Sequence, residues 1–204
     1  MSVAIIDYGM CNLGSVRRAF EECGADVKVI DQPRDLDSAD HIVLPGVGAF
    51  TKGMANLHSQ GWVEALNQNA LKERKPLLGI CLGMQLLAEI GLEGGETKGL
   101  GFIPGRVERF ISTSPEIRIP HVGWNEIHFE SSPLFKGLAP GTDFYFVHSY
   151  HFVIKNAANK LSSTPYCGEF VSAVHNQNIY GVQFHPEKSQ KPGFKLIQNF
   201  LSLC

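Results

Sequence analysis

The chain has 204 residues, of which 44% are hydrophobic and 19% are charged, and its formal net charge at pH 7 is −2. This composition is typical of a globular protein with its own core, and it excludes an intrinsically disordered chain. The charge gives no electrostatic basis for binding nucleic acid or an anionic membrane, and no apolar run approaches the ~18 residues that a membrane-spanning helix requires.

The N-terminus and the cysteines indicate the compartment. The first ten residues, MSVAIIDYGM, lack the basic region of a signal peptide and predict a strand instead. The five cysteines are odd in number, scattered and without a C-x-x-C pair. This arrangement argues against a disulfide framework or a zinc site and favours a reducing compartment. We therefore predict a cytoplasmic protein.

The first half of the sequence alternates between short apolar runs and helical patterns. The runs predicted to form strands are VAIIDYG (3–9), DVKVI (26–30), HIVLPG (41–46) and PLLGIC (76–81). Helices are predicted over 12–24, with Asn12 as N-cap and Gly24 as the stop, over 61–75, and from Leu82 to Ile90, closed by Gly91. Strands separated by helices indicate a parallel sheet covered on both faces, with ligands at the carboxyl ends of the strands.

From about residue 99 the pattern changes to short alternating or aromatic runs separated by turn residues. These runs predict mostly antiparallel strands over 105–110, 121–129, 144–152, 170–176 and 179–187. A final helix over 193–203 presents Phe194, Ile197 and Leu201 on one face. We predict an α/β fold in a single domain of residues 1–204, with a central mostly parallel sheet, helices on both faces and an additional antiparallel portion.

Cys81 stands at the predicted corner between a strand and a helix, with Gly79 and Gly83 two residues to either side. This is the cysteine form of a nucleophile elbow, and it predicts an exposed and strained sulfur. The glycines allow a tight turn, and the amino end of the following helix favours a thiolate. The backbone N–H of Leu82 is then free to donate to an oxyanion. A packing cysteine at a tight junction is the alternative, which the pentapeptide alone does not exclude.

The segment VQFHPEKS supplies a base and a group to orient it. In an extended chain residues i and i+2 point the same way, so His185 and Glu187 share a face, and Pro186 keeps the segment from becoming helical. Glu187 would then orient the imidazole of His185 toward Cys81. A strand-ending histidine with a solvated glutamate is the alternative, and the cysteine elbow upstream weakens it.

The stretch LPGVGAF (44–50) follows an apolar strand and places glycines at positions 46 and 48. It lacks the Gly-Lys-Ser/Thr of a P-loop, so a phosphate site is not indicated. Its backbone N–H groups, together with that of Leu82, suit an oxyanion hole for acyl transfer. An ordinary glycine-rich turn is the alternative.

The remaining histidines indicate no metal site. His148 and His151 would point to opposite faces of an alternating strand, with no carboxylate or cysteine at ligand spacing. His121 is predicted to lie in a loop, and His128 on the surface of a sheet.

The three chemical segments, in this order, resemble the class I (triad) glutamine amidotransferase family. PGVGAF, GICLGMQLL and GVQFHPEKS match its oxyanion strand, nucleophile elbow and catalytic His/Glu segment. DYGMCNLGSV, PHVGWNEI and YFVHSY are further similar to the glutaminase subunits of imidazole glycerol phosphate synthases, and the matching stretches run from residue 5 to residue 200. The resemblance implies that Cys81 attacks the side-chain amide of glutamine, that His185 shuttles the proton and that Glu187 orients His185. It also implies a heterodimer with a (β/α)₈-barrel cyclase subunit that receives the ammonia for histidine biosynthesis, and no cofactor.

The same resemblance implies roles for further residues. The oxyanion-hole donors are Val47 and Leu82. The glutamine-binding positions are Gly48, Gln85, Glu93, Ser149 and Tyr150. The positions near the partner interface are Asn12, Trp124, Tyr145 and Lys188. Glutaminase activity would stay low until partner and acceptor substrate bind, because the loop around Val47 must reorient. Cys11 stands where this motif commonly has glycine, which we interpret as a small-residue replacement.

Other functions remain compatible with the sequence. Relatives of these subunits supply ammonia to barrel partners that amidate surface-polysaccharide sugars, and their motifs would be nearly the same. A stand-alone cysteine hydrolase that cleaves γ-glutamyl bonds would need neither a tunnel nor a partner. A non-catalytic binding module of the same fold would tend to lose a triad member, whereas all three are present here.

Overall fold

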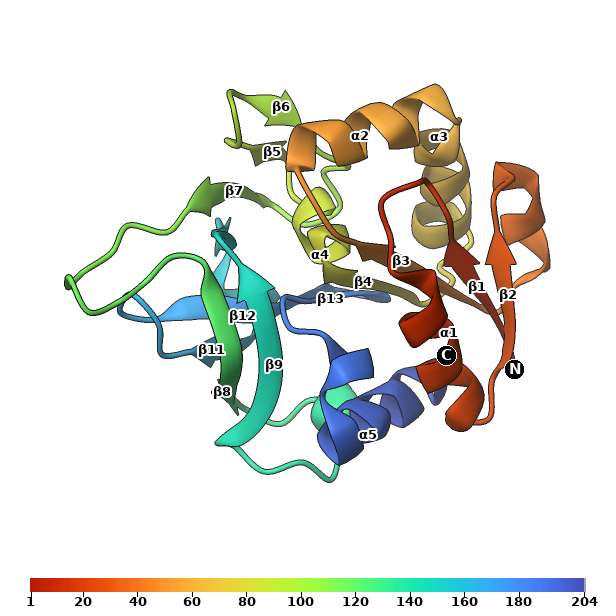
Figure 1. Cartoon of the computed structure of the whole chain (residues 1–204). Coiled ribbons are helices and arrows are strands. Elements are labelled where there is room, and N and C mark those ends of the chain that lie inside the picture. Colours follow the sequence, from red (N-terminus) through yellow and green to blue (C-terminus); the bar gives the residue numbers. More distant parts are fainter. Residues whose placement is uncertain (204) are drawn as a thin grey trace.

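The computed structural model describes residues 1–203, and its strands form one thirteen-stranded sheet with helices on both faces (Figure 1). One half of this sheet is parallel, in the order β2-β1-β3-β4-β13. The bounds of these strands are β1 (Ser2–Ile6), β2 (Asp26–Ile30), β3 (His41–Gly46), β4 (Leu77–Cys81) and β13 (Ile179–Val182). β3 and β4 are buried at every position, as expected for apolar strands covered on both faces.

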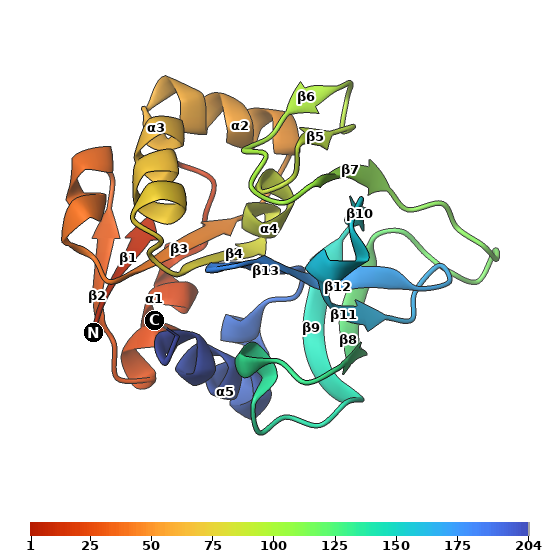
Figure 2. The same ribbon diagram turned by 180° about the vertical axis from the view of Figure 1, so that it is seen from behind.

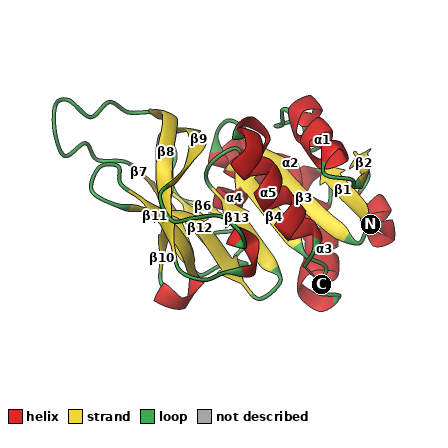
Figure 3. Cartoon of the chain, turned by 90° about the horizontal axis from the view of Figure 1, so that it is seen from below, coloured by secondary structure: helices red, strands yellow, loops and turns green. Residues whose placement is uncertain are grey.

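Two layers of helices cover this parallel half (Figures 1 and 3). One face carries α1 (Leu13–Glu22) and α5 (Gln190–Leu201), and the other carries α2 (Phe50–Ser59), α3 (Trp62–Leu66) and α4 (Leu82–Leu86). A π-helical turn, η2 (Asn67–Lys72), continues α3. Side chains alternate between the two faces of each strand, so the sheet divides the apolar core in two. Val3 and Ile5 belong to the cluster under α1 and α5, whereas Ala4 and Ile6 belong to the cluster under α2, α3 and α4.

The second half of the sheet is mostly antiparallel. From β13 it continues through β12 (Phe170–Asn176), β10 (Tyr150–Ile154), β7 (Gly105–Arg109), β5 (Ile90–Gly91) and β6 (Thr97–Lys98). A branch from β12 passes through β11 (Lys160–Thr164) to β8 (His121–Phe129) and β9 (Thr142–His148), which lie across the end of the sheet (Figure 2). Short 3₁₀ turns complete the elements: η1 (Pro33–Ser38), η3 (Pro133–Phe135), η4 (Ala157–Asn159) and η5 (Pro186–Lys188).

The predicted α/β class, with its parallel portion and antiparallel extension, is confirmed. The final helix also docks as expected, with Ile197 fully buried, although it begins at Gln190 rather than at Gly193. Among residues 1–203, no helix has the length and the apolar character needed to cross a membrane.

The predicted helix from Leu82 to Ile90 is wrong. α4 ends at Leu86, and Ile90 begins the short strand β5. The helix tightens at its end, where Leu87 N–H donates to Met84, and Glu89 N–H then donates to the carbonyl oxygen of Gly105. Pairing with a distant segment therefore overrides a helical pattern.

α2 and β11 were not predicted at all. The start of α2 carries no local capping residue, and its Phe50 N–H is satisfied at 2.7 Å by Oε2 of Glu93. A cap that comes from 43 residues along the chain leaves no local signal in the sequence.

Gly83 allows α4 to lie directly on β3, because a Cβ atom at this position would overlap the carbonyl oxygen of Leu44. We expect Gly83→Ala to lower the free energy of unfolding by at least ~2 kcal/mol, because backbone must move to admit the methyl group. Urea unfolding measures this. Gly14→Ala, at an exposed position in α1 with nothing within 4 Å of the new Cβ, is the control and should leave stability unchanged or raise it by up to ~1 kcal/mol. Equal stability of the two variants would contradict this account.

Candidate active site

The carboxyl ends of β3, β4 and β13 lie side by side. They bring together the segments that carry Val47, Cys81 and His185. In the parallel register Gly46 is opposite Cys81, and Val182 is opposite Ile80. His185 follows Val182 by three residues and therefore reaches the same edge. Ligand sites in α/β sheets form at this edge.

The strand-to-helix corner predicted at Cys81 is present. Cys81 has φ +55° and ψ −111°, a conformation that residues with a Cβ rarely adopt. The corner is tight enough that a Cβ on Gly79 would lie 2.7 Å from the carbonyl oxygen of Gly83. The expectation of an exposed sulfur is wrong, because Cys81 is only 7% exposed. It lies at the base of a cleft rather than on the surface.

His185 and Glu187 form a buried pair in which Nδ1 lies 2.7 Å from Oε1, with both side chains at most 3% exposed. The extended conformation predicted here is wrong beyond His185, because Pro186 to Lys188 form the turn η5. Proline is tolerated in the first position of a helical turn, where no backbone N–H is needed. The turn, closed by Lys188 N–H donating to the carbonyl of His185, brings the carboxylate back to the ring.

The charge of this pair is set by its neighbours. Burial of the His185 ring opposes protonation, but interactions with Cys81 and Glu187 outweigh it and raise the pKa of His185 to about 10. Nε2 of His185 makes no hydrogen bond with any residue from 1 to 203. A protonated imidazole with a free N–H beside a sulfur atom can supply the proton that a leaving amine requires.

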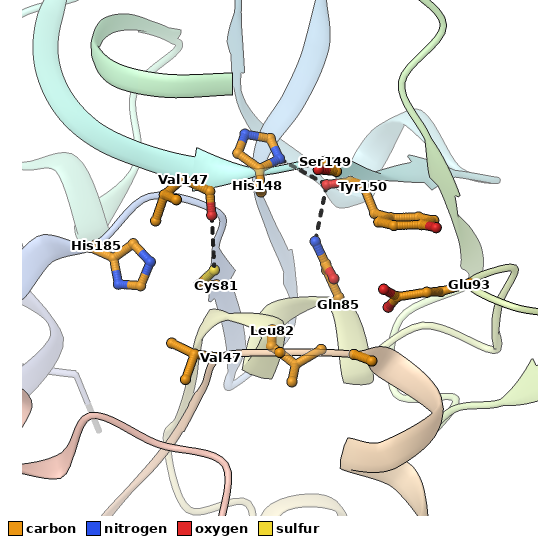
Figure 4. A pocket seen from close by; sticks show the side chains of 12 residues that line it. Val47, Cys81, Leu82, Gln85, Glu93, Val147, His148, Ser149, Tyr150 and His185 are labelled. Atoms are coloured by element: carbon orange, nitrogen blue, oxygen red, sulfur yellow. Dashed lines mark hydrogen bonds between the residues drawn. The ribbon is translucent and has the colours of Figure 1, made fainter. Parts of the chain in front are cut away.

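A cleft of about 520 Å³ opens over Cys81 and His185. Figure 4 shows Cys81 and His185 toward one end, and Gln85, Tyr150 and Glu93 toward the other. Every predicted oxyanion and glutamine-binding residue lines this cleft: Val47, Gly48, Leu82, Gln85, Glu93, Ser149 and Tyr150. Glu187 lies behind His185 and does not line it.

The two predicted oxyanion donors are in different states. Leu82 is the first residue of α4, where a backbone N–H has no partner within the helix. Val47 N–H instead donates to the carbonyl oxygen of Met10 at 2.7 Å. The next residue, Gly48, has φ +106°, so the loop already contains a glycine-dependent turn. One of the two donors is therefore engaged away from an oxyanion.

Two buried glutamines connect the sulfur to the far wall of the cleft. Nε2 of Gln183 lies 3.7 Å from Sγ of Cys81, and Nε2 of Gln85 donates to Oε1 of Gln183 and to the carbonyl oxygen of Tyr150, at 3.0 Å each. Gln183 and the carbonyl of Met10 were not predicted from the sequence. The only sequence signal for Gln183 is that it precedes His185 by two positions.

Three of the four predicted interface residues gather beside the site. The rings of Trp124 and Tyr145 lie 6.1 Å apart, and Nζ of Lys188 lies 5.8 Å from the Tyr145 ring. Trp124 is 48% exposed, which is unusual for so large an apolar side chain. Asn12 lies at the start of α1, and α1 packs against the turn η5 that carries Lys188. The carbonyl of Tyr145 also accepts the N–H of His185 at 2.9 Å.

The histidine predictions need correction. His121 is buried at the start of β8, not in a loop. The rings of His148 and His151 both pack on Phe110 rather than pointing to opposite faces, because the strand is interrupted at Ser149. His128 is exposed, as predicted. Among residues 1–203, no three His, Cys, Asp or Glu side chains are grouped so as to hold a metal ion.

Comparison with known proteins gives one consistent result. Residues 4–203 match the family model of the class-I glutamine amidotransferases. Relatives that are 46% identical include "Imidazole glycerol phosphate synthase subunit HisH 1" of Campylobacter jejuni strain RM1221, which covers 98% of this chain and 100% of its own length. Another is the HisH subunit of Moorella thermoacetica, with 97% and 93% covered. A solved glutamine amidotransferase (19% identity, TM-score 0.76, 98% and 96% covered) and the glutaminase domain of Trypanosoma brucei CTPS (19%, 0.70, 99% and 92%) share the fold.

We expect Glu187→Gln to lower the pKa of His185, because the substitution removes a negative group that raises it. A raised folded-state pKa stabilises the fold fully below the ~6.5 of an unfolded histidine and progressively less as pH rises toward about 10. The unmodified chain should therefore lose thermal stability between pH 7 and pH 10, and the variant should lose less.

An NMR titration of the His185 ring measures the pKa directly. Glu126→Gln is the matched control, because Glu126 pairs with the exposed His128 at 3.1 Å, also two residues away. An unchanged His185 titration in Glu187→Gln would refute the assignment.

Proposed function

The chain belongs to the class I glutamine amidotransferase family, and we propose that it is the glutaminase subunit of imidazole glycerol phosphate synthase. The observation that carries the chemistry is the strained Cys81 at the base of a cleft beside the buried His185–Glu187 pair. Relatives of nearly equal length that carry the subunit name support the pathway. We assign residues 1–204 to a single glutaminase domain, and we place it in the cytoplasm.

The arrangement suits hydrolysis of a carboxamide through a thioester. The sulfur of Cys81 attacks the side-chain carbonyl carbon of glutamine, and His185 transfers a proton to the departing nitrogen, which leaves as ammonia. His185 then accepts a proton from water as the water oxygen attacks the thioester carbon, which releases glutamate and restores the thiolate of Cys81 beside the protonated ring. Glu187 holds the ring in one orientation throughout, through its bond to Nδ1.

The far end of the cleft suits the α-carbon substituents of glutamine. The carboxylate of Glu93 is the group there with a full negative charge, and it attracts the α-ammonium of the substrate. Gly48, Gln85, Ser149 and Tyr150 supply backbone and amide groups around the same volume.

The oxyanion loop provides the means of regulation. Val47 N–H cannot stabilise an oxyanion while it donates to Met10, so the peptide that carries it must turn before the hole is complete. The surface formed by Asn12, Trp124, Tyr145 and Lys188 is where the (β/α)₈-barrel cyclase docks to form the heterodimer. The bond from His185 N–H to Tyr145 connects that surface directly to the catalytic base.

The test is glutamate production by the chain alone and then with the cyclase subunit and its nucleotide ligand. We expect strong activation in the complex and a loss of at least about 10³-fold in Cys81→Ala, because the nucleophile is removed. Cys23→Ala, at the end of α1, is the matched control and should retain activity.

Two other results would redirect the assignment. Basal activity that depends on Cys81 but is not increased by the cyclase would retain the amidotransferase chemistry and point to a sugar-modifying barrel partner. Full activity of the chain without any partner would instead indicate a stand-alone γ-glutamyl hydrolase.

Glu93→Gln tests the orientation of the substrate. We expect KM for glutamine to rise roughly 10-fold or more with little change in kcat, because a charged hydrogen bond to a group distant from the reacting carbon is lost. Steady-state kinetics of the complex measure both constants. Glu96→Gln, on an exposed neighbouring residue, is the control. A fall in kcat at unchanged KM would place Glu93 outside the substrate-binding groups.

A further inference from the structure

The chain turns a corner at Ser149 in the wall of the cleft. β9 ends at His148, and β10 begins at Tyr150. The two strands belong to different parts of the sheet, since β9 pairs with β8 whereas β10 pairs with β7 and β12. The shape of the cleft wall therefore depends on whatever fixes this single-residue corner.

The ring of His148 spans the corner. Its Nδ1 lies 2.7 Å from the carbonyl oxygen of Tyr150, two residues ahead. A dashed line marks this bond in Figure 4. A carbonyl oxygen only accepts hydrogen bonds, so Nδ1 of His148 carries the proton. The same oxygen accepts a second bond from Nε2 of Gln85, which lines the cleft.

A second buried histidine continues the chain of bonds. Nδ1 of His121 lies 3.1 Å from Nε2 of His148. In a neutral ring that donates from Nδ1, Nε2 is an acceptor, so His121 must donate from its own Nδ1. Its Nε2 in turn lies 3.2 Å from Nδ2 of Asn125 and accepts from it.

The amide of Asn125 fixes the direction at the outer end. Its Nδ2 also donates to the carbonyl oxygen of Pro165 at 3.1 Å, and its Oδ1 accepts the backbone N–H of Glu126 at 2.9 Å. Donors and acceptors are thus assigned at both ends, and all bonds run one way, from Asn125 through His121 and His148 to Tyr150.

The surroundings keep both rings neutral, as this order requires. His121 and His148 are 3% and 6% exposed, and His121 stacks on Phe146 and Tyr166 with ring centroids 4.7 Å and 3.9 Å away. Burial lowers the pKa of His148 to about 3 and that of His121 to about 4. Neither ring is the proton carrier of the reaction, which the buried pair of His185 and Glu187 provides.

We propose that His121 and His148 are positioning residues for glutamine, holding the Ser149–Tyr150 corner through a one-way chain of hydrogen bonds. The proposal rests on the glutaminase function proposed above. His121 lies outside the cleft lining, and His148 lines the cleft beside Ser149, so both are assigned a role through the backbone of the corner rather than through the sulfur. Because the corner forms the wall and not the nucleophile, loosening it should weaken substrate binding more than it slows the chemical step.

The first experiment determines the tautomers by ¹H–¹⁵N NMR of the histidine rings in the unmodified chain, without substrate. We expect both His121 and His148 to carry the proton on Nδ1, the less common position for a free imidazole. A proton on Nε2 of His148 would overturn the proposal. This result does not depend on glutaminase activity, so it tests the chain of bonds even if the proposed function fails.

The second experiment compares two isosteres of His148 in the complex with the cyclase. Asn places an amide N–H where Nδ1 stands and keeps the bond to Tyr150, whereas Gln places its amide at the Nε2 position and loses that bond. We expect KM for glutamine to rise about threefold to tenfold in His148→Gln, with kcat nearly unchanged, and to stay near the original value in His148→Asn.

His128→Gln, which changes an exposed histidine on β8, is the control and should not alter KM. Equal effects of the two His148 variants, or no effect of either, would overturn the proposal, because a general packing role does not distinguish the two ring nitrogens. If both variants fail to fold, the tautomers of the unmodified chain decide. A complex without glutaminase activity would refute the proposed function separately.

Discussion

The parallel register of β3, β4 and β13 is the constraint on which the site depends. It sets Gly46 opposite Cys81 and starts the His185 segment one strand away. Such close approach is possible because side chains are absent at Gly79 and Gly83, where backbones meet, and at Gly46, which packs against the hydroxyl of Tyr8. The same packing holds Cys81 at a positive φ, so the strain of the elbow is sustained by the surrounding sheet and helix rather than by a local turn sequence.

Burial gives this site its electrostatic character. The His185–Glu187 pair is nearly inaccessible to water, so the carboxylate acts on the ring at short range with little screening. His148, which lines the same cleft, and His121 are also buried but have no carboxylate partner, and their pKa values fall instead of rising. Identical side chains thus differ in charge because Cys81 and Glu187 lie beside His185 and no such groups lie beside the other two rings.

Features carried by short segments could be predicted from the sequence, whereas features formed between distant segments could not. The elbow at Cys81 and the pairing of His185 with Glu187 each lie within a few residues, and the strands follow from local apolar runs. Three contacts join residues that lie 37 to 102 positions apart, and no local pattern in the sequence indicates them. They are the cap of α2 by Glu93, the bond from Val47 to Met10 and the contact of Gln183 with Cys81. The extended form expected at Glu187 was wrong because proline both forbids a helix interior and suits a helix start.

The position of Glu93, between the start of α2 and the cleft, bears on how the product is released. Its carboxylate accepts the N–H that begins α2 and also lines the cleft. In the proposed orientation glutamate retains the α-ammonium that Glu93 attracts, so hydrolysis does not weaken that end of the product. The change in affinity arises only at the other end, where an uncharged amide becomes a carboxylate next to His185. In that orientation the Glu93 end of the cleft binds substrate and product alike, and only the His185 end distinguishes them.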